Sequence, residues 1–415
     1  MDPIVFAIPV FFALMGLEAW WGWRRGRPAY RLNDAIASIS LGTYSQLTGL
    51  AGKLVVLAIY VACYEHLRWF TLSPEWWWVW IVGLLLYDFC YYWQHRLGHE
   101  VALLWAAHVV HHQSEEFNLS TALRQTSSGF LFGWIFYLPM ALLGFPPLVF
   151  VVVGLIDLLY QYWIHTEQIG RLGWFDRVFA SPSNHRVHHA VNDRYLDRNY
   201  GGILILWDRL FGSFEDEDPE EPPVYGTRAP LRGFEPVSAN LQVYRQLWQQ
   251  LREAPNWSTR LGYLLRPPGW RPAGSPPSEP FSMARLHKFD PPHPRGLWPW
   301  LTALQFLLLT LAATTLLGLA SSGLPWTALL LGCGWCLTGL SLLGRWLETR
   351  TPSRWLLLTA ALFNLLSLLS LPWWPLSGGL QVWLLCLLLL HGLSAGATAW
   401  LSRRFDRAPS TLPEG

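Results

Sequence analysis

The chain has 415 residues, of which 52% are hydrophobic and only 14% are charged. Soluble globular domains carry about 25% charged residues, so this composition excludes an ordinary soluble protein. The net charge is only +2, and the arginines stand at the ends of apolar segments rather than in one patch, so no nucleic-acid partner is expected.

The first 75 residues (1–75) are interpreted as N-terminal membrane helices. Residues 4–23 are apolar apart from Glu18, and an arginine cluster follows them, which predicts an uncleaved anchor with its N-terminus outside the cell. A second apolar segment is predicted at about 42–62 and a third at about 76–94. The third segment begins the next region of the chain.

That region, 76–215, is interpreted as the catalytic core, and it contains two further apolar segments, at about 129–144 and 148–164. The sequence Gly144-Phe145-Pro146-Pro147 joins them. Each segment is shorter than the roughly 20 residues that a spanning helix needs. Two arrangements fit: a hairpin that enters the bilayer and returns, or a tight pair of spanning helices.

The rest of the chain is a polar stretch followed by four apolar segments. Residues 216–296 are interpreted as a cytoplasmic linker, in which an amphipathic helix at about 238–253 is expected on the membrane surface. The region 297–415 is interpreted as a four-helix transmembrane region, with segments at about 297–319, 325–344, 355–371 and 380–400. No charged residue occurs from Leu297 to Gly344 or from Trp355 to Ser402.

Arginines alternate with uncharged turns between these four segments. Arg345, Arg350 and Arg354 follow the second segment, whereas the turns at 320–324 and 372–379 carry no charge. Because positive residues flank the cytoplasmic ends of membrane helices, this alternation places the C-terminus and the polar stretch in the cytoplasm. In a bacterium the host membrane would be the plasma (inner) membrane.

Nine of the thirteen histidines lie between residues 95 and 189, in the pattern HxxxH, HxxHH, a single His, and HxxHH. On a helix, residues three and four apart share a face, so each cluster can direct its imidazoles toward one point. Imidazole binds iron, copper, zinc and nickel, and nine ligands are too many for one ion but suit two. The predicted ligands are His95, His99, His108, His111, His112, His165, His185, His188 and His189.

The predicted fold class is therefore all-α: a multi-pass transmembrane helical protein with a histidine-rich di-metal site at the cytoplasmic face. Asp88 and Asp157 precede His95 and His165 within the apolar segments. A charge in the hydrocarbon layer is costly, so we expect each aspartate to accept an N–H from a ligating imidazole. The alternative is a protonated or locally paired aspartate that only joins helices.

Four stretches of sequence around these histidines resemble the fatty acid hydroxylase / sterol desaturase superfamily. The stretches are HRLGHE (95–100), HVVHHQSEEFNLSTALRQ (108–125), YQYWIHTE (160–167) and SPSNHRVHHAVNDRYLDRNYGGILILWDRLFGSF (181–214). The resemblance spans about residues 75–265 and is greatest to the branch of alkylglycerol monooxygenase and its bacterial relatives. It implies that the histidines other than His165 ligate two irons, and His165 falls where the branch carries an additional histidine. Relatives often have a His pair where this chain has Asn184 and His185, so how one coordination position is filled stays open.

The resemblance further implies a membrane-bound non-haem di-iron monooxygenase that uses O₂ to hydroxylate an alkyl C–H of a lipid taken from the bilayer, with cleavage of ether lipids (alkylglycerols) as one form. An apolar cleft between 76–94 and 129–164 would admit the lipid tail. The reaction needs an electron donor: tetrahydrobiopterin, a ferredoxin or a cytochrome-like protein. Glu100 and the Ser114-Glu115-Glu116 stretch are candidate contacts to this donor or cofactor.

Two other functions are considered. A lipid or sterol desaturase would use the same di-iron site and remove a second hydrogen, and the sequence does not separate it from a hydroxylase. A metal transporter or sensor would use the histidines to carry ions. A transporter places its ligands near the bilayer midplane across several spans, whereas these histidines are predicted at one face. Zinc also competes with iron for imidazole ligands.

Overall fold

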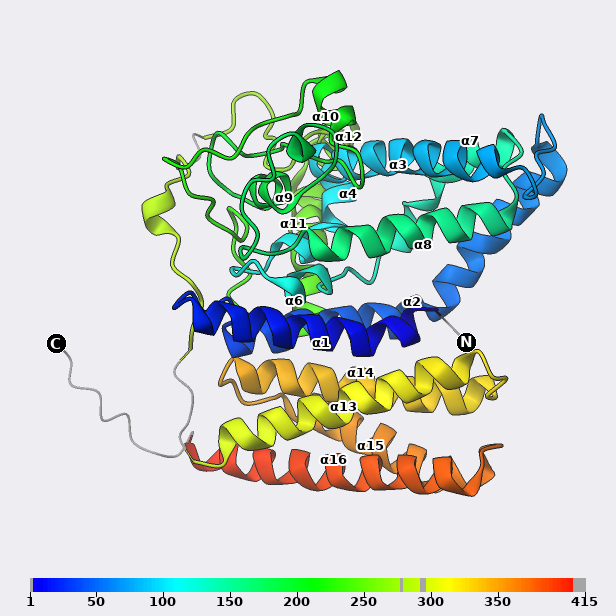
Figure 1. Cartoon of the computed structure of the whole chain (residues 1–415). Coiled ribbons are helices and arrows are strands. Elements are labelled where there is room, and N and C mark those ends of the chain that lie inside the picture. Colours follow the sequence, from blue (N-terminus) through cyan, green and yellow to red (C-terminus); the bar gives the residue numbers. More distant parts are fainter. Residues whose placement is uncertain (1–2, 277–278, 292–295, 406–415) are drawn as a thin grey trace. The chain divides into compact units, whose positions relative to one another are not determined.

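The computed structural model describes residues 3–276, 279–291 and 296–405. Within these ranges the chain forms α-helices and short 3₁₀ helices and no β-strand, so the predicted all-α fold class is confirmed (Figure 1). The chain divides into two compact units, one built from residues 11–231 and 239–288 and the other from 1–10, 232–238 and 289–415.

The unit that contains the histidines is built from the N-terminal and central helices. Its α-helices are α1 (Pro3–Arg24, of which the first turns belong to the other unit), α2 (Leu32–Leu67), α3 (Trp77–Glu100), α4 (Ala102–Ala106), α5 (Val109–His112), α6 (Leu119–Ala122), α7 (Trp134–Leu142), α8 (Pro147–Trp163), α9 (Pro182–His188), α10 (Leu206–Phe211), α11 (Pro236–Glu253) and α12 (Trp257–Leu265). The 3₁₀ helices in this unit are η1 (Gly129–Leu131), η2 (Phe175–Arg177) and η3 (Met283–Arg285).

The other unit contains four long helices, which agree with the four predicted C-terminal segments to within a few residues. They are α13 (Trp298–Ala320), α14 (Trp326–Leu347), α15 (Arg354–Ser370) and α16 (Gly378–Phe405), with the 3₁₀ helix η4 (Leu371–Trp373) after α15. Each packs on its neighbours in a bundle, with contacts between α13 and α14, α14 and α15, α13 and α16, and α15 and α16.

Five of the described helices are long and apolar enough to cross a membrane, namely α2, α13, α14, α15 with its 3₁₀ extension, and α16. The chain is therefore a multi-pass membrane protein. Helix α3 has 24 residues but is not among the five, because polar residues such as Asp88, Gln94 and Arg96 interrupt its apolar sequence. Helix α8, with 17 residues, and α7, with nine, are both shorter than a full span.

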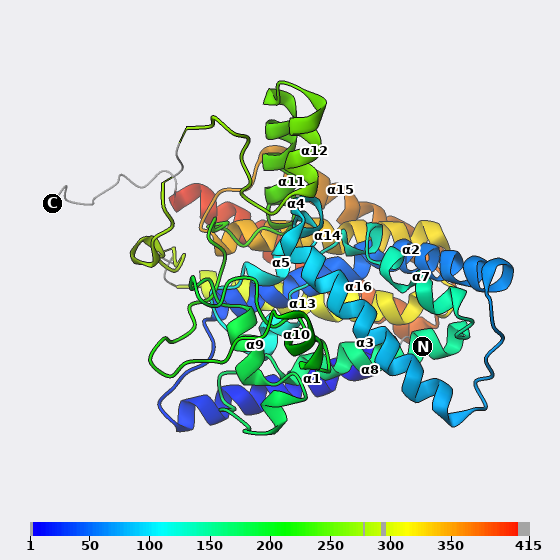
Figure 2. The same ribbon diagram turned by 90° about the horizontal axis from the view of Figure 1, so that it is seen from above.

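Helices α3 and α8 lie side by side, and α7 packs on α2 and α3 (Figure 1 and Figure 2). Their common core includes Tyr60, Val79, Tyr137 and Val149, all nearly fully buried. The turn between α7 and α8 depends on Gly144, which has φ +84° and would place a Cβ 1.9 Å from the carbonyl oxygen of Phe70. The chain therefore returns at this point with no room for a side chain.

Helix α11 confirms the predicted amphipathic helix, and part of its apolar face packs on the protein itself. Ala239 packs against Val109 and Val110 beside α5, and Leu247 packs against the alanines of α4. This part of its apolar stripe covers the segment that carries the first HxxHH cluster, and its place on the membrane surface stays a prediction. The amphipathic pattern alone does not say what the apolar face contacts.

Candidate metal centre

The structure brings all nine predicted histidines together in two groups. Within each group one nitrogen of every imidazole lies within 4.8 Å of the others, and eight of the nine residues are buried. The nine histidines are thus divided into groups of five and four, and the binding of two ions stays a prediction. The first group is His95, His99, His108, His112 and His188, and the second is His111, His165, His185 and His189.

Each HxxHH cluster contributes to both groups, which the sequence interpretation did not anticipate. Histidines four residues apart stay together, as His108 and His112 do in the first group and His185 and His189 in the second. The middle histidine of each cluster, His111 or His188, joins the other group. The reason is angular: residues four apart on a helix differ by about 40°, and residues three apart by about 60° in the opposite sense.

Backbone carbonyls fix the imidazole tautomers. Four of the Nδ1 atoms lie 2.7–2.9 Å from a carbonyl oxygen and must donate to it, which leaves the lone pair on Nε2. The pairs are His95 with Tyr200, His111 with Arg124, His165 with Gln161, and His188 with Arg198.

The Nε2 atoms then face one another without protons. His111 and His165 both donate from Nδ1, yet their Nε2 atoms are only 3.2 Å apart, so two lone pairs oppose each other. The Nε2 atoms of His95, His99 and His188 are buried and have no hydrogen-bond partner. Ligands at right angles around an ion, with metal–nitrogen distances of about 2.1 Å, lie about 3.0 Å apart. The arrangement of the histidines thus fits a metal site, because a cation would remove this repulsion and satisfy the orphaned atoms.

The histidines outside the membrane helices are held neutral. Burial lowers the pKa of His111 to about 4, and it lowers the pKa values of His112, His185, His188 and His189 well below the usual 6.5. A metal ligand must be the neutral imidazole, so the site is ready for a cation at neutral pH.

The carbonyls of Arg198 and Tyr200 come from a strained turn. Asp197 and Asn199 have φ values of +57° and +59°, in the left-handed region that side chains other than glycine rarely adopt. The Asn199 side chain stabilises the turn, since its amide donates to the carbonyls of Asn184 at 3.1 Å and Glu215 at 2.8 Å. Aspartate and asparagine adopt this region more readily than other side chains, but their positions in the sequence do not reveal which carbonyls the turn directs to the histidines.

Asp208 also supports the Tyr200 carbonyl and was not predicted. Its carboxylate, fully buried, accepts from the backbone N–H groups of Tyr200 and Gly201 at 2.7 Å each and from Ser213 Oγ at 2.7 Å. Burial raises the pKa of Asp208 to about 6. Asp208 lies eight residues after Tyr200 in the sequence, and only the folded chain shows that the two are in contact.

The predicted contact between the membrane aspartates and the imidazoles is wrong. Asp88 accepts from the backbone N–H groups of Ile203 at 2.7 Å and Leu204 at 3.0 Å and from Trp207 Nε1 at 2.8 Å, and Asp157 accepts from Gln161 at 2.7 Å. The imidazole N–H bonds go to backbone carbonyls instead. A separation of seven or eight residues on a helix is about 10–12 Å, too far for a direct bond.

The alternative interpretation of these aspartates agrees with their surroundings. A Cβ added to Gly202 would lie 2.9 Å from a carboxylate oxygen of each, so the two side chains meet at this glycine. Asp88 thus anchors the segment 202–207 that follows Tyr200 to helix α3, and Asp157 on α8 lies against Gly202 of the same segment.

The remaining predicted residues are engaged in structural contacts. Glu100 pairs with Arg96 at 2.9 Å on α3, and whether it contacts an electron donor stays a prediction. Asn184, which stands beside His185, accepts a hydrogen bond from Ser181 Oγ at 3.0 Å.

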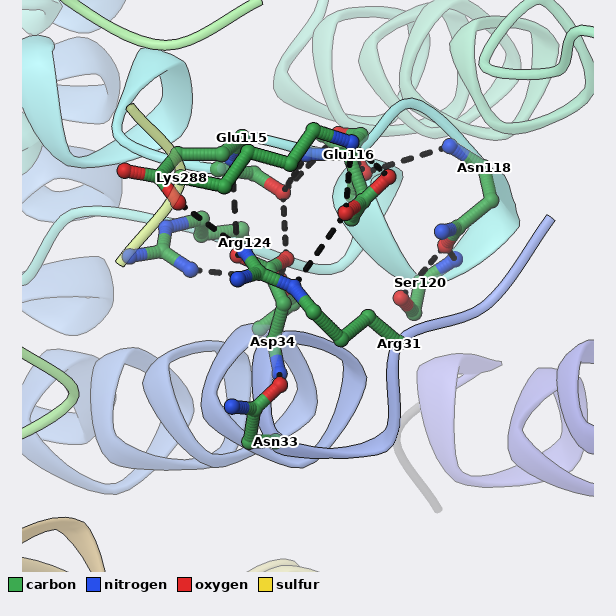
Figure 3. Close-up of polar contacts among 12 residues, drawn as sticks. Arg31, Asn33, Asp34, Glu115, Glu116, Asn118, Ser120, Arg124 and Lys288 are labelled. Carbon is green, nitrogen blue, oxygen red and sulfur yellow. Dashed lines mark hydrogen bonds and ion pairs between the residues drawn. The ribbon is translucent and has the colours of Figure 1, made fainter. Parts of the chain in front are cut away.

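An ionic cluster clamps the segment after the first HxxHH cluster to the start of α2 (Figure 3). Arg31 pairs with Glu115 at 2.9 Å and with Glu116 at 3.2 Å, and Lys288 pairs with Glu116 at 2.7 Å. Glu115 and Glu116 were predicted as candidate contacts to the electron donor. Their carboxylates are instead held in ion pairs with Arg31 and Lys288. The clamp lies in the segment that links His111 to Arg124, whose carbonyl is 2.8 Å from His111 Nδ1.

Arg124 itself is almost fully buried, with only 1% of its surface exposed. Its guanidinium donates to the carbonyl of Val110 at 2.9 Å and to Ser38 Oγ at 3.3 Å. Asp34, also buried, accepts from Ser114 Oγ at 2.5 Å. These contacts tie α2 to both ends of the segment 110–124.

Glu18, the one charge in the N-terminal apolar segment, supports the second group in the same way. Its carboxylate accepts from Thr166 Oγ1, from Tyr30 OH, and from the backbone N–H of Leu119 at 2.9 Å. Thr166 directly follows His165, so α1 helps to position this ligand.

Two cavities reach the histidines. The first, which we name the polar cleft, has a volume of about 710 Å³ and lies between α4, α11, the segment 188–197 and the segment 263–270. The second, the inner cavity, has about 280 Å³ and lies between α3, α7 and α8. Phe136 and Tyr137 line the inner cavity, whereas Trp134, Tyr160, Tyr162 and Trp163 do not.

Comparison with known proteins places this site in a family. Residues 80–213 match the family model described as Fatty acid hydroxylase. Alkylglycerol monooxygenase of Homo sapiens is 42% identical over 272 residues, which are 65% of this chain and 60% of that protein. Alkylglycerol monooxygenase of Danio rerio is 40% identical over 307 residues, or 73% of this chain and 68% of that protein.

A bacterial relative is more distant. Ornithine lipid hydroxylase OlsE of Rhizobium tropici is 27% identical over 240 residues, covering 55% of this chain and 70% of that protein. No solved structure matches the chain. The chain thus spans 60% to 68% of the two alkylglycerol monooxygenases. The family model and the identity to these relatives together show that the chain belongs to the fatty acid hydroxylase family.

Proposed function

We propose that this chain is a membrane-bound di-iron monooxygenase that hydroxylates an alkyl C–H bond of a lipid, with alkylglycerol ethers as its substrate class. The observation that carries the proposal is the arrangement of nine imidazoles in groups of five and four, with proton-free Nε2 atoms facing one another. The printed names of the most similar relatives support the choice of an alkylglycerol.

The atoms balance as R–H + O₂ + two electrons + two protons → R–OH + H₂O. Two bound irons would supply the reduction of O₂ and the oxidation of the C–H bond. When the hydroxylated carbon bears the ether oxygen, the product is a hemiacetal, which separates into an aldehyde and an alcohol.

The protein's own residues hold the lipid and exclude water. The inner cavity borders His95, His108 and His111, and its walls include Phe132 and Phe136. We propose that the alkyl chain lies along these walls, where water is excluded from the reacting carbon. The alcohol end of the lipid would then find hydrogen-bonding groups such as Gln94, whose buried side-chain oxygen has no partner.

We further propose that the histidine site and the C-terminus are cytoplasmic and the N-terminus is outside. Arg345, Arg350 and Arg354 stand between α14 and α15, and the uncharged turns lie at the opposite ends of the bundle helices. The electron donor would therefore be cytoplasmic: tetrahydrobiopterin, a ferredoxin or a cytochrome-like protein.

Product analysis tests the proposed reaction. The iron-loaded protein in lipid nanodiscs would be supplied with ¹⁸O₂, a chemical reductant and an alkylglycerol, a fatty acid or a sterol, and the products identified by mass spectrometry. We expect a long-chain aldehyde and free glycerol from the alkylglycerol. Alkene products would instead establish the desaturase alternative. The chain is 25% identical over 186 residues to a sterol desaturase, which is why this alternative is tested. No oxidised product from any lipid would contradict both.

A further inference from the structure

Two buried carboxyl groups meet beside the inner cavity and take no part in holding the histidines. Asp88 on α3 is 1% exposed and Asp157 on α8 is 2% exposed. A Cβ added to Gly202 would lie 2.9 Å from the Oδ1 atom of each, so the two Oδ1 atoms are no further apart than twice that distance. The two carboxyl groups are within hydrogen-bonding reach of each other.

This contact requires a proton between the two aspartates. Two negative charges at close range and away from water repel strongly, so such a pair ionises only once. In the part of the chain that the structure describes, no lysine, arginine or histidine forms an ion pair with either carboxyl group. A hydrogen bond between two carboxyl groups also needs one of them to be protonated, because a carboxylate only accepts.

The other hydrogen bonds of the pair indicate which aspartate carries the proton. Asp88 accepts from three N–H groups of the segment 203–207, at 2.7–3.0 Å, and these donors stabilise its charged form. Asp157 accepts only from Gln161 Nε2, at 2.7 Å on Oδ2, and its buried Oδ1 receives no hydrogen bond from a described N–H or O–H group. Asp88 is therefore the carboxylate, and Asp157 Oδ1–H donates to it.

The protonated member of the pair is also the one that lines the inner cavity. Asp157 borders this cavity together with three of the histidines, whereas Asp88 does not. Gln161 fixes the orientation of Asp157, because its Nε2 donates to Asp157 and its Oε1 accepts from Tyr91 OH at 2.6 Å. The Tyr91 ring lies 5.2 Å from the ring of His95, centroid to centroid. A polar wall therefore extends from Asp157 to the histidines.

The inner cavity thus has two sides with different chemistry. Phe132 and Phe136 form an apolar side, where the alkyl chain of the lipid is proposed to lie. Tyr91, Asp157 and Gln161 form the polar side, and of these only Asp157 is an acid that can release a proton near neutral pH. A hydroxylation that consumes protons in a cavity closed to bulk water needs such a group.

We propose that Asp157 is the proton donor of the reaction and that Asp88 holds the proton on it between turnovers. This inference rests on the proposed function, in which O₂ takes up two electrons from an external donor and two protons. In the step assigned to Asp157, its O–H bond breaks, and the proton forms an O–H bond of the product water. Asp157 is left as a carboxylate beside Asp88, and the repulsion between them favours uptake of the next proton from solvent.

Infrared difference spectroscopy tests the proton on Asp157 without relying on turnover. The full-length protein is measured at neutral pH in a maltoside detergent, which contains no carbonyl group, and is compared with Asp157→Asn. We expect the parent to show the C=O stretching band of a protonated carboxyl group and the variant to lack it. Transfer of the parent into D₂O should shift the band, because a proton donor must exchange with solvent to be reloaded.

Two further variants control this experiment. Asp193→Asn makes the same chemical change at a side chain that is 82% exposed and should retain the band. Asp88→Asn turns amide hydrogens toward the N–H groups of the segment 203–207 and should lower the unfolding midpoint. Asp157→Asn keeps a donor to Asp88, so its iron content and unfolding midpoint should match the parent.

Turnover then tests the role of the proton. Lipid oxidation by Asp157→Asn should fall about 100-fold or more, since an amide cannot replace a general acid. The assignment is overturned if the parent shows no protonated carboxyl band, if the band persists in Asp157→Asn, if it does not shift in D₂O, or if the variant oxidises lipid at the parent's rate. The shift in D₂O is measured on the parent and holds even where the variant folds poorly.

Failure of this assignment is distinguishable from failure of the proposed function. A parent that oxidises lipid as fast as Asp157→Asn does would reject the proton donor and leave the monooxygenase standing. A parent that oxidises no lipid, but whose exchangeable band is lost in Asp157→Asn, would reject the monooxygenase and leave the proton on Asp157.

Discussion

At the scale of single residues, the metal centre depends on hydrogen bonds from imidazoles to backbone carbonyls. A carbonyl holds the ring and its tautomer without adding a charge to the site. Because the acceptors of the imidazole N–H groups are backbone carbonyls, the nine histidines could be predicted from the sequence but the residues that hold them could not. Histidine spacing is visible in the sequence, whereas the carbonyls of Tyr200, Arg124 and Arg198 carry no sequence signal of their own.

The neutral state of the histidines predicts how the metal-free protein responds to acid. The pKa of His111 is about 4 in the folded chain and about 6.5 when unfolded, so the unfolded state takes up the proton first. The free energy of unfolding therefore falls as the pH falls through 6.5. Protonation of His111 in the unfolded state alone lowers it by about 1.4 kcal/mol at pH 5.5. Asp208, with its pKa raised to about 6, acts in the opposite sense but is one group against several histidines.

We expect the unfolding midpoint of metal-stripped protein in detergent to fall between pH 7.5 and pH 5.5. Differential scanning fluorimetry measures this directly. A midpoint that stays level or rises over this range would show that the histidines are not held neutral by the fold.

Asp208 provides a test of the carbonyl support. Asp208→Asn retains one acceptor but turns an amide N–H₂ toward the backbone N–H of Tyr200 or Gly201, so the Tyr200 carbonyl should move away from His95. Loss of such supporting contacts typically weakens metal binding 10- to 100-fold. The measurement is iron retained during dialysis against a graded chelator. Asp193→Asn, at a side chain 82% exposed, is the matched control and should retain iron as the parent does.

At the scale of elements, the sequence predicted the long helices well and their partners poorly. The four C-terminal helices follow from charge-free runs bounded by arginines, and they were placed to within a few residues. The amphipathic α11 was also placed, but its partner, the segment around Val109 and Val110, could not be read from its own periodicity. Each HxxHH cluster contributes histidines to both groups. This division depends on how tertiary contacts orient the short helices α5 and α9, which the sequence does not reveal.

Close packing of α2 against the segment 119–124 gives a prediction at this scale. A Cβ on Gly42 would lie 2.1 Å from the carbonyl oxygen of Leu123, so the backbone must move. Gly42→Ala should destabilise the protein by about 1–3 kcal/mol and reduce iron retention, because Leu123 adjoins the carbonyl that holds His111. Gly49→Ala on the same helix meets nothing within 4 Å and should be neutral or slightly stabilising. Equal effects of the two variants on the unfolding midpoint would contradict the packing argument.

At the scale of the whole molecule, the chain combines a histidine-bearing unit with a bundle of four apolar helices. The described interior of this bundle is apolar with isolated polar contacts, such as Gln305 to Thr398 at 2.8 Å and Trp335 to His391 at 3.0 Å. The arginines of the bundle determine the predicted orientation of the chain.

Cysteine labelling tests that orientation. Ser322→Cys lies in the turn between α13 and α14, which we predict outside, and Thr349→Cys lies between α14 and α15, which we predict in the cytoplasm. A membrane-impermeant maleimide applied to intact cells should label the first variant and not the second, and the parent chain supplies the background. The reverse pattern would invert the proposed orientation.

Iron content per chain tests the central claim most directly. Protein purified without O₂ would be compared with the double variant His111→Ala/His188→Ala, which removes one ligand from each histidine group, and with the exposed His66→Ala as control. We predict two irons in the parent and in His66→Ala, and a sharp loss in the double variant. A parent that holds no metal, or one tightly bound zinc with no iron-dependent turnover, would contradict the assignment as a di-iron monooxygenase.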